Sequence, residues 1–252
     1  MCEMLGFTFS KNTDMTEYLN EFFSHSVKHS HGWGLMFDGE EKLTLKEPLA
    51  AYKSDMLKGV LDGLEPLKNG LAHIRFATVG SIEYDNCHPF TGIDISGREW
   101  MLIHNGTIYS SRHAHHYYSC QAGNTDSERF FLSMLDHIND RLEKSKLSQR
   151  ERFEMVNDFI TQSAPRNKLN LIIYDGELLY IHKNLKNTLS FKRTDNGIIF
   201  STVPLDEVGW APFPMNQVIA YKDGSEIYRG VRHKGEYIPT LEYITALDVM
   251  YI

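Results

Sequence analysis

The chain begins with MCEMLGFTFS (residues 1–10), in which a cysteine in second position enters an alternating run of apolar residues. The alternation predicts a β-strand that starts at Cys2. The initiator methionine is normally removed before a small residue, and cysteine is small enough. Loss of Met1 would leave Cys2 with a thiol nucleophile and its own free α-amine as general base. The alternative is an ordinary small residue at the start of a strand.

The composition describes an ordinary globular chain. It has 252 residues, of which 42% are hydrophobic, enough for a substantial core in one large domain or two small ones. Cys2, Cys87 and Cys120 are odd in number and widely spaced, so they predict neither a disulfide framework nor a paired zinc motif. A reduced compartment is therefore expected.

Several classes of partner are excluded by charge and hydropathy. The net charge of -7 and the lack of a dense Lys/Arg cluster argue against nucleic acid. No run approaches the roughly 18 apolar residues of a membrane span, and the N-terminus lacks a basic segment followed by an apolar one, as in a secretory signal. We therefore expect a cytoplasmic protein without a membrane partner.

The first two thirds of the chain predict mixed secondary structure. Helices are expected over residues 12–29, 51–64 and 125–144, and a further helix is favoured over a domain boundary in residues 142–166. Buried strands are expected over residues 32–39, 71–78 and 100–108, the last two joined by a long loop that holds Cys87, His88 and Pro89.

The last third changes character. Residues 169–183, 189–202 and 217–228 each place Asp-Gly or Asn-Gly between two apolar runs, which predicts three β-hairpins. Strands on both sides of a central helical segment favour an α+β layered fold over repeated βαβ units. We expect one domain over residues 1–252.

Polar residues suited to catalysis or substrate binding stand at the ends of predicted strands and at the start of a predicted helix. Arg75 ends one strand, Asn105 and Gly106 end another, and Asp126 starts a helix. An enzyme for a free amino acid with an amide side chain needs a cation for the α-carboxylate, an anion for the α-ammonium, a nucleophile and oxyanion donors. Arg75, Asp126, Cys2 and the Asn105–Gly106 pair could supply these in turn.

The order of short motifs resembles a known family. A second-position Cys is followed by HGWG (31–34), HIRFATVG (73–80), NCHPF (86–90), HNGTI (104–108) and NTDSE (124–128), as in the glutaminase domain of class II glutamine amidotransferases. Free-standing members without a synthase domain are the more similar. The segment STVPLDEVGWAPFPMNQVIAYKDG (201–224) is similar to the closing segment of that family.

The resemblance implies a fold and a set of roles. The fold would be a four-layer α/β/β/α sandwich of the N-terminal nucleophile hydrolase type, with Cys2 at the start of a central strand. Cys2 would be the nucleophile, its α-amine the base, and Asn105 with Gly106 the oxyanion site. Arg75 and Thr78 would bind the substrate carboxylate and Asp126 its ammonium. Val79 stands where synthase-fused members often have His.

Structural roles compete with each functional one. Arg75 could be a surface charge, Asn105–Gly106 a hairpin turn and Asp126 a helix cap. To replace the functional interpretation, all of these structural roles would have to apply at once, in residues that follow the order of the family's motifs. Within HGWG, residues 31–34 are expected to allow close backbone approach at the pocket floor, with Trp33 equally suited to the core.

A histidine-rich segment offers ligand types for zinc. His113, His115, His116 and Cys120 lie close in sequence, but adjacent histidines seldom converge on one ion and the mechanism implied by the family needs no metal. We expect no metal site and no cofactor.

Two classes of function remain open. The favoured one is hydrolysis of the side-chain amide of glutamine or a γ-glutamyl amide through a Cys2 thioester, with or without a separate synthase subunit that receives the ammonia. The other is a non-catalytic regulatory or binding subunit that retains the pocket.

Overall fold

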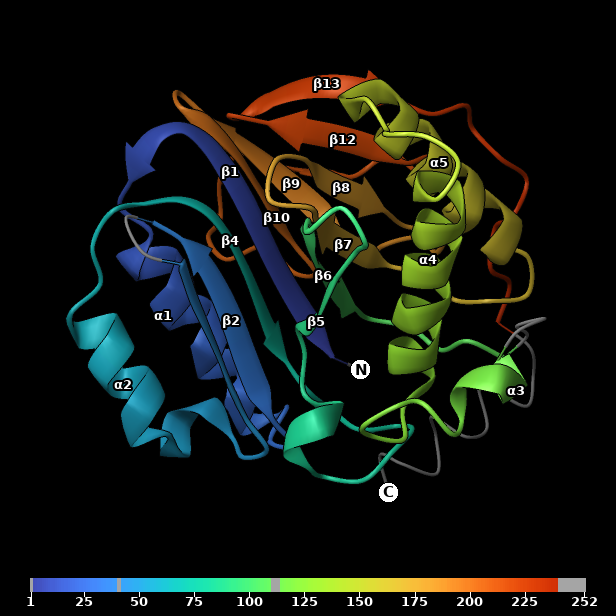
Figure 1. Ribbon diagram of the computed structural model, residues 1–252. Coiled ribbons are helices and arrows are strands. Elements are labelled where there is room, and N and C mark those ends of the chain that lie inside the picture. Colours follow the sequence, from blue (N-terminus) through green and yellow to red (C-terminus); the bar gives the residue numbers. More distant parts are fainter. Residues whose placement is uncertain (1, 40–41, 110–113, 240–252) are drawn as a thin grey trace.

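The computed structural model describes residues 2–39, 42–109 and 114–239 (Figure 1). The strands of the first sheet are β1 (Glu3–Thr13), β2 (Trp33–Asp38), β3 (Lys42–Glu47), β4 (Leu67–Ile74), β9 (Ser190–Thr194), β10 (Gly197–Ser201) and β11 (Trp210–Pro212). Within the described ranges they form one antiparallel sheet in the order β11-β9-β10-β1-β4-β2-β3. The strand that follows Cys2 is therefore central.

A second antiparallel sheet stacks on the first. Its strands are β5 (Phe90–Ile93), β6 (Glu99–His104), β7 (Leu171–Tyr174), β8 (Leu179–His182), β12 (Ile219–Lys222) and β13 (Ser225–Arg229). The described part of this sheet has the order β13-β12-β8-β7-β6-β5. The helices are α1 (Thr16–Ser24), α2 (Asp55–Asp62), α3 (Ala114–Tyr117), α4 (Asp126–Leu142) and α5 (Gln149–Ser163).

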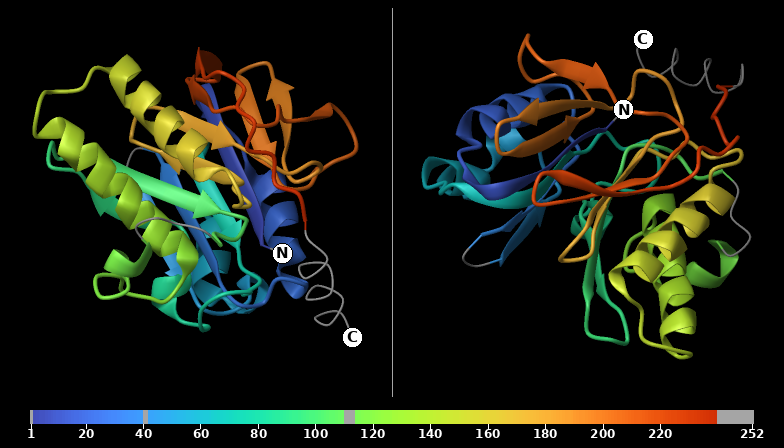
Figure 2. Two further views of the ribbon diagram at one scale, coloured as in Figure 1. Left: turned by 90° about the vertical axis from the view of Figure 1, so that its right-hand side faces the viewer. Right: turned by 90° about the horizontal axis from the view of Figure 1, so that it is seen from above.

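The helices cover the two outer faces of the stacked sheets. Helices α1 and α2 lie against the first sheet, and α4 and α5 lie against the second (Figures 1 and 2). This is the expected four-layer α/β/β/α sandwich, an arrangement in which each sheet buries both of its faces.

The alternating side chains of β1 explain why this strand lies in the middle. Leu5, Phe7 and Phe9 belong to the core between the first sheet and its helices. Met4 belongs to the core between the sheets. Gly6 also faces the second sheet, where a Cβ would lie 3.0 Å from Ile172. Both faces of β1 are therefore buried over most of its length, which agrees with its mainly apolar sequence.

The third core lies between the second sheet and its helices. Phe130, Phe131 and Met134 of α4 and Val156 of α5 share this core with Trp100 of β6. Thr125 caps α4 by accepting the Glu128 N–H, and Ser148 and Glu151 form a capping box at α5.

The expected hairpins are confirmed in all three places. They are the pairs β7–β8, β9–β10 and β12–β13, and the helix favoured in residues 142–166 is α5. The sequence prediction did not include β3, β5 or β11. In the described residues, no helix is both long and apolar enough to cross a membrane.

Candidate active site

Cys2 lies directly before β1 and next to the end of β4. The antiparallel register pairs Glu3 with Ile74, which brings Cys2 to the residues that follow β4. The Phe76 N–H donates to Cys2 Sγ at 3.3 Å, and the thiol contacts the Phe76 carbonyl oxygen at 3.4 Å. The sulfur is thus fixed by the backbone of the segment that follows β4.

Opposing effects act on the Cys2 thiol. Burial raises its pKa above the ordinary value, because a thiolate loses solvation there. The hydrogen bond from Phe76 and the positive charges of Arg75 and Lys168 act in the other direction. The net shift is upward, so an isolated Cys2 thiol would be protonated at neutral pH and would need a base.

Arg75 is buried, with 3% of its surface exposed. Its backbone is held by HGWG: the Arg75 N–H donates to Gly32 O at 2.7 Å, and the His31 N–H donates to Arg75 O at 3.0 Å. These two bonds extend the pairing of β4 with β2 by a further residue. They fix the backbone position from which the Arg75 side chain extends.

The guanidinium of Arg75 binds the loop that follows it. Nη1 donates to Ser81 O at 2.8 Å, and Nη2 donates to Val79 O at 3.0 Å and Gly80 O at 3.3 Å. Three of its five N–H donors are therefore engaged by backbone carbonyls. Thr78 lies exposed in the same loop. A carboxylate at Arg75 would use the remaining donors or displace these carbonyls.

The glycines of HGWG allow close backbone packing, as expected. Gly32 has φ of +146°, and a Cβ there would lie 2.6 Å from Cys87 Sγ. A Cβ on Gly34 would lie 1.9 Å from His88 O. Trp33 has no exposed surface and lies in the core beneath α1. The motif thus joins Arg75 to the loop of Cys87 and His88.

Asn105 and Gly106 follow the end of β6. Asn105 exchanges two hydrogen bonds with Asn170, its N–H donating to Asn170 O at 3.0 Å and its carbonyl accepting from Asn170 Nδ2 at 2.9 Å. At Gly106 a Cβ would lie 1.9 Å from Lys168 O. A glycine is needed here because the backbone of residues 168–170 packs directly on this segment.

Asp126 is the first residue of α4 and is 8% exposed. Its Oδ2 accepts the Ile108 N–H at 2.6 Å. The cap of the helix is Thr125, so the alternative that Asp126 serves merely as the cap is wrong. The carboxylate instead joins the start of α4 to the segment that follows Gly106.

Lys168 lies in the site but was missed by the sequence prediction. It is 1% exposed and forms a two-way backbone bridge with Thr107, and its carbonyl lies 3.0 Å from His104 Nε2. Burial lowers the pKa of its ammonium to about 8, and the negative charge of a Cys2 thiolate opposes that shift. The available signal was a polar residue just before a buried strand, whereas Arg75 was singled out just after one.

The start of β1, which follows Cys2, thus lies at the same end of the sandwich as the ends of β4 and β6 and the start of α4, toward the lower part of Figure 1. Met1 and His113 lie outside the described residues, as does the side chain of His115. His116 and Cys120 are exposed. No group of three or more metal-ligating side chains occurs among the described residues.

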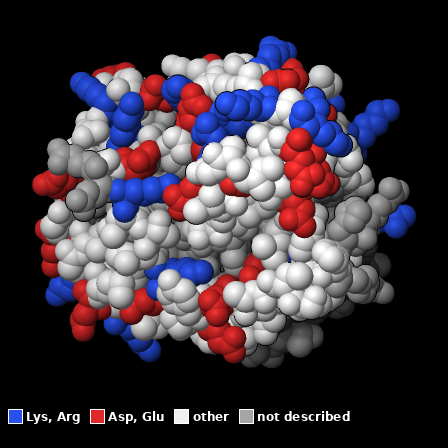
Figure 3. All heavy atoms as spheres, in the orientation of Figure 1, with Lys and Arg blue, Asp and Glu red and all other residues white. Residues whose placement is uncertain are grey.

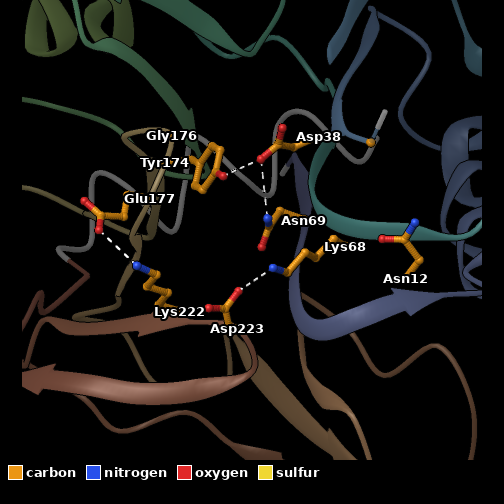
Figure 4. Close-up of a pocket in the computed structure, with 10 residues that line it drawn as sticks. Asn12, Asp38, Lys68, Asn69, Tyr174, Gly176, Glu177, Lys222 and Asp223 are labelled. Carbon is orange, nitrogen blue, oxygen red and sulfur yellow. Dashed lines mark hydrogen bonds and ion pairs between the residues drawn. The ribbon is translucent and has the colours of Figure 1, made fainter. Parts of the chain in front are cut away.

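A cavity of about 420 Å³ lies at the other end of the sandwich and is distinct from this site (Figure 4). Asn12, near the end of β1, is among its lining residues. The lining ions pair with one another, Lys68 with Asp223 at 2.8 Å and Lys222 with Glu177 at 3.0 Å. Asn12 lies nine positions along β1 from Glu3, a span of roughly 30 Å.

The surface carries both signs of charge. On the face shown in Figure 3, Lys and Arg are interspersed with Asp and Glu, and neither sign gathers into one large patch.

The fold and the site define a class, a layered N-terminal nucleophile hydrolase fold with a cysteine before its central strand. A 2.0 Å crystal structure of a predicted glutamine amidotransferase from Pseudomonas aeruginosa has a TM-score of 0.62 at 19% identity, covering 90% of this chain and 100% of that chain. The Bacillus subtilis glutamine phosphoribosylpyrophosphate amidotransferase has a TM-score of 0.63 at 16% identity; the match covers 90% of this chain and 48% of that one.

Sequence comparison gives the family. The model of class-II glutamine amidotransferases matches residues 1–196, and the chain belongs to that family. It is 29% identical over 264 residues to an uncharacterized protein of Methanocaldococcus jannaschii, covering 92% of this chain and 72% of the relative. It is also 29% identical over 199 residues to YafJ of Escherichia coli K12, a provisionally named glutamine amidotransferase, covering 73% and 74%.

Proposed function

We propose that the protein hydrolyses the side-chain amide of glutamine or of a γ-glutamyl amide through a thioester on Cys2, in the cytoplasm, as a single domain over residues 1–252. The observation that carries the proposal is the contact of Cys2 Sγ with the Phe76 N–H at 3.3 Å, at the end of the sandwich where β4 and β6 end and α4 begins. Family membership supports the same reaction class.

In the proposed acylation step, the free α-amine of processed Cys2 accepts the thiol proton and Sγ attacks the amide carbon. The carbonyl oxygen gains the electron pair, and the Asn105 side chain with the Gly106 N–H donates to it. Collapse of this intermediate breaks the C–N bond, and the leaving nitrogen takes the proton from the α-ammonium. The products are ammonia, or an amine, and a γ-glutamyl thioester.

Water completes the proposed cycle. The α-amine of Cys2 accepts a proton from the attacking water, the same donors stabilise the second oxyanion, and the C–S bond breaks to return the thiol and release glutamate. An α-amine of ordinary pKa near ~7.7 to 8.0 suits both transfers near neutral pH.

The proposed substrate contacts are electrostatic. Asp126 binds the α-ammonium, and Arg75, with Thr78 nearby, binds the α-carboxylate. Arg75 reaches the carboxylate through the donors that the carbonyls of residues 79–81 leave unused, or by exchanging those carbonyls for it. Bidentate pairing of guanidinium with carboxylate is stronger than the neutral contacts it would replace.

The test is a turnover assay with the processed protein on glutamine and a panel of γ-glutamyl amides, measuring glutamate and released amine. Hydrolysis of one or more of these compounds supports the proposal, and the preferred amide names the substrate. Stoichiometric binding of glutamine without product would instead support a non-catalytic subunit for a partner synthase.

A further inference from the structure

Asn86 is a buried asparagine of the loop before β5, and the proposed chemistry gives it no role. None of its surface is exposed, and its carboxamide makes hydrogen bonds in two directions. Nδ2 donates to Ser81 O at 2.9 Å, to Ser81 Oγ at 3.2 Å and to Asn124 Oδ1 at 2.7 Å. Oδ1 accepts the Asn124 N–H at 2.8 Å. One side chain therefore joins the loop that follows β4 to the loop that precedes α4.

The first set of bonds ends at a carbonyl that also holds Arg75. Arg75 Nη1 donates to Ser81 O at 2.8 Å, so the guanidinium and the Asn86 carboxamide share one acceptor. Gly80, directly before Ser81, has φ of +81°, and a Cβ there would lie 2.6 Å from Asn124 Oδ1. A glycine is needed because the two loops approach closely at this point. A shift of Ser81 O would move one of the contacts that orient the Arg75 guanidinium.

The second set of bonds ends close to Asp126. Asn124 lies two residues before Asp126, in the loop that leads into α4. The Glu128 carboxylate, in the first turn of α4, accepts the N–H groups of residues 122–123 at 2.6 and 2.9 Å. This loop is therefore tied to the helix. A side chain that holds Asn124 also fixes the start of the helix, where Asp126 lies.

We propose that Asn86 is a positioning residue that sets the separation of Arg75 and Asp126, the two groups proposed to bind the charged ends of the substrate. A free α-amino acid carries its carboxylate and its ammonium on one carbon, so its recognition requires a cation and an anion at a fixed separation. Asn86 acts through the two loops rather than by contact with substrate. The inference rests on the proposed function in that Arg75 binds the α-carboxylate and Asp126 the α-ammonium.

A second asparagine supplies the matched control. Asn184 also has no exposed surface, and its side chain makes four hydrogen bonds, as that of Asn86 does. Its partners are backbone groups of residues 164, 167, 169 and 235, outside the loops that Asn86 joins. Replacing either asparagine by alanine should lower stability to a similar extent, but only Asn86→Ala should alter recognition of the α-amino acid group.

The experiment measures kcat and KM of the processed full-length protein for L-glutamine and for glutarate monoamide, which lacks the α-ammonium. Asn86→Ala should raise KM for glutamine about tenfold and change kcat by no more than about twofold, because the lost hydrogen bonds position binding groups. The preference for glutamine, measured as the ratio of the two kcat/KM values, should also fall about tenfold, since the analogue needs no fixed separation of charges.

Asn184→Ala should keep the preference of the wild type. A wild-type preference in Asn86→Ala, or an equal loss of preference in Asn86→Ala and Asn184→Ala, would overturn the inference.

Asn124→Ala keeps the test valid if Asn86→Ala does not fold. Asn124 is exposed, so its truncation should be tolerated, and the change removes the acceptor of Asn86 Nδ2 and of the Ser81 N–H at 3.0 Å. Amide hydrogen exchange at Ser81 should become faster in this variant, and the preference for glutamine should fall as in Asn86→Ala. Faster exchange with a wild-type preference would contradict the inference, because the link would then exist without setting recognition.

Calorimetric titration with L-glutamine separates this inference from the proposed function, because binding to Cys2→Ala needs no turnover. Suppose that the wild type shows no amidase activity but that adding Asn86→Ala to Cys2→Ala weakens glutamine binding about tenfold. That result would support the inference and reject hydrolysis. Turnover of glutamine by the wild type, with an unchanged preference in Asn86→Ala, would do the reverse.

Discussion

The sulfur of Cys2 and the backbone of Phe76 make a two-way contact, with the Phe76 N–H 3.3 Å and the Phe76 carbonyl oxygen 3.4 Å from Sγ. The side chain thereby takes the place of a further backbone pair between β1 and β4. A backbone N–H donor lowers the pKa of the thiol, against the larger effect of burial. The thiol is thus located by the sheet rather than by a flexible loop.

Cys2→Ala should abolish turnover and leave the fold intact, because the change removes a single partly buried sulfur. The measurements are glutamate release and the thermal unfolding midpoint. Cys87→Ala is the control: Cys87 is 1% exposed and packs against Gly32, so this variant should lose some stability but keep its chemistry. Residual turnover by Cys2→Ala at a rate close to the wild type would reject the mechanism.

Asp126→Asn should lower kcat/KM for glutamine by a factor that corresponds to about 2 to 5 kcal/mol of lost binding free energy. This is the usual loss when a desolvated charge loses its partner. The asparagine can still accept the Ile108 N–H, so the local structure should be kept. The wild type should use glutarate monoamide, which lacks the α-ammonium, poorly. If Asp126→Asn discriminates against that analogue as strongly as the wild type does, Asp126 does not bind the ammonium.

Arg75 provides the complementary prediction for the carboxylate. Arg75→Lys should raise KM strongly, since a lysine lacks the planar fork and cannot hold the carbonyls of residues 79–81 in the same way. For substrates whose α-carboxylate is amidated, Arg75→Lys and the wild type should have similar KM values. A KM for glutamine equal to that of the wild type would contradict the proposed contact.

Gly106→Ala should destabilise the protein by about 1 to 3 kcal/mol and impair turnover, because the new Cβ would lie 1.9 Å from Lys168 O and must displace it. Chemical denaturation measures this cost. Gly59→Ala is the control: Gly59 lies within α2 with nothing within 4 Å of a new Cβ, so it should be neutral or stabilising. Wild-type stability in Gly106→Ala would refute the close approach of residues 106 and 168.

The sequence carried much of the fold because its strongest signals were local. Asp-Gly and Asn-Gly turns located three hairpins, and the spacing of apolar residues located α1, α2, α4 and α5. The unpredicted β3 has the sequence KLTLKE, in which only Leu43 and Leu45 alternate with polar residues, so its apolar pattern is too short to stand out. The short strands β5 and β11 form because neighbouring strands pair with them, and such pairing leaves little trace in sequence.

The candidate site was less predictable than the fold. Arg75, Asn105 and Asp126 stood out because polar residues end apolar segments, but the engagement of Arg75 by three carbonyls depends on the course of residues 79–81. Lys168 acquires its place only when β7 pairs with β6 and brings residue 168 beside Thr107. That contact joins residues 61 positions apart, which no local pattern encodes.

Processing of Met1 should control activity, because a retained Met1 would lock the α-nitrogen of Cys2 in a peptide bond that cannot accept a proton. Protein shown by intact mass to keep Met1 should turn over little, and removal of Met1 by an aminopeptidase should restore activity. Full activity of wholly unprocessed protein would exclude the α-amine as base. His31 and His88 would then be tested first, although His31 Nδ1 already accepts the Ala77 N–H.

The central claim, that Cys2 is the nucleophile of an amide hydrolase, is tested most directly by reacting the processed protein with a γ-glutamyl electrophile and locating the adduct by peptide mass. The account predicts one added group, on Cys2, with loss of turnover in proportion to labelling and protection by glutamine. Cys120 is exposed and Cys87 buried, so accessibility alone would favour Cys120. Labelling of Cys120 in preference to Cys2, without protection by glutamine, would contradict the claim.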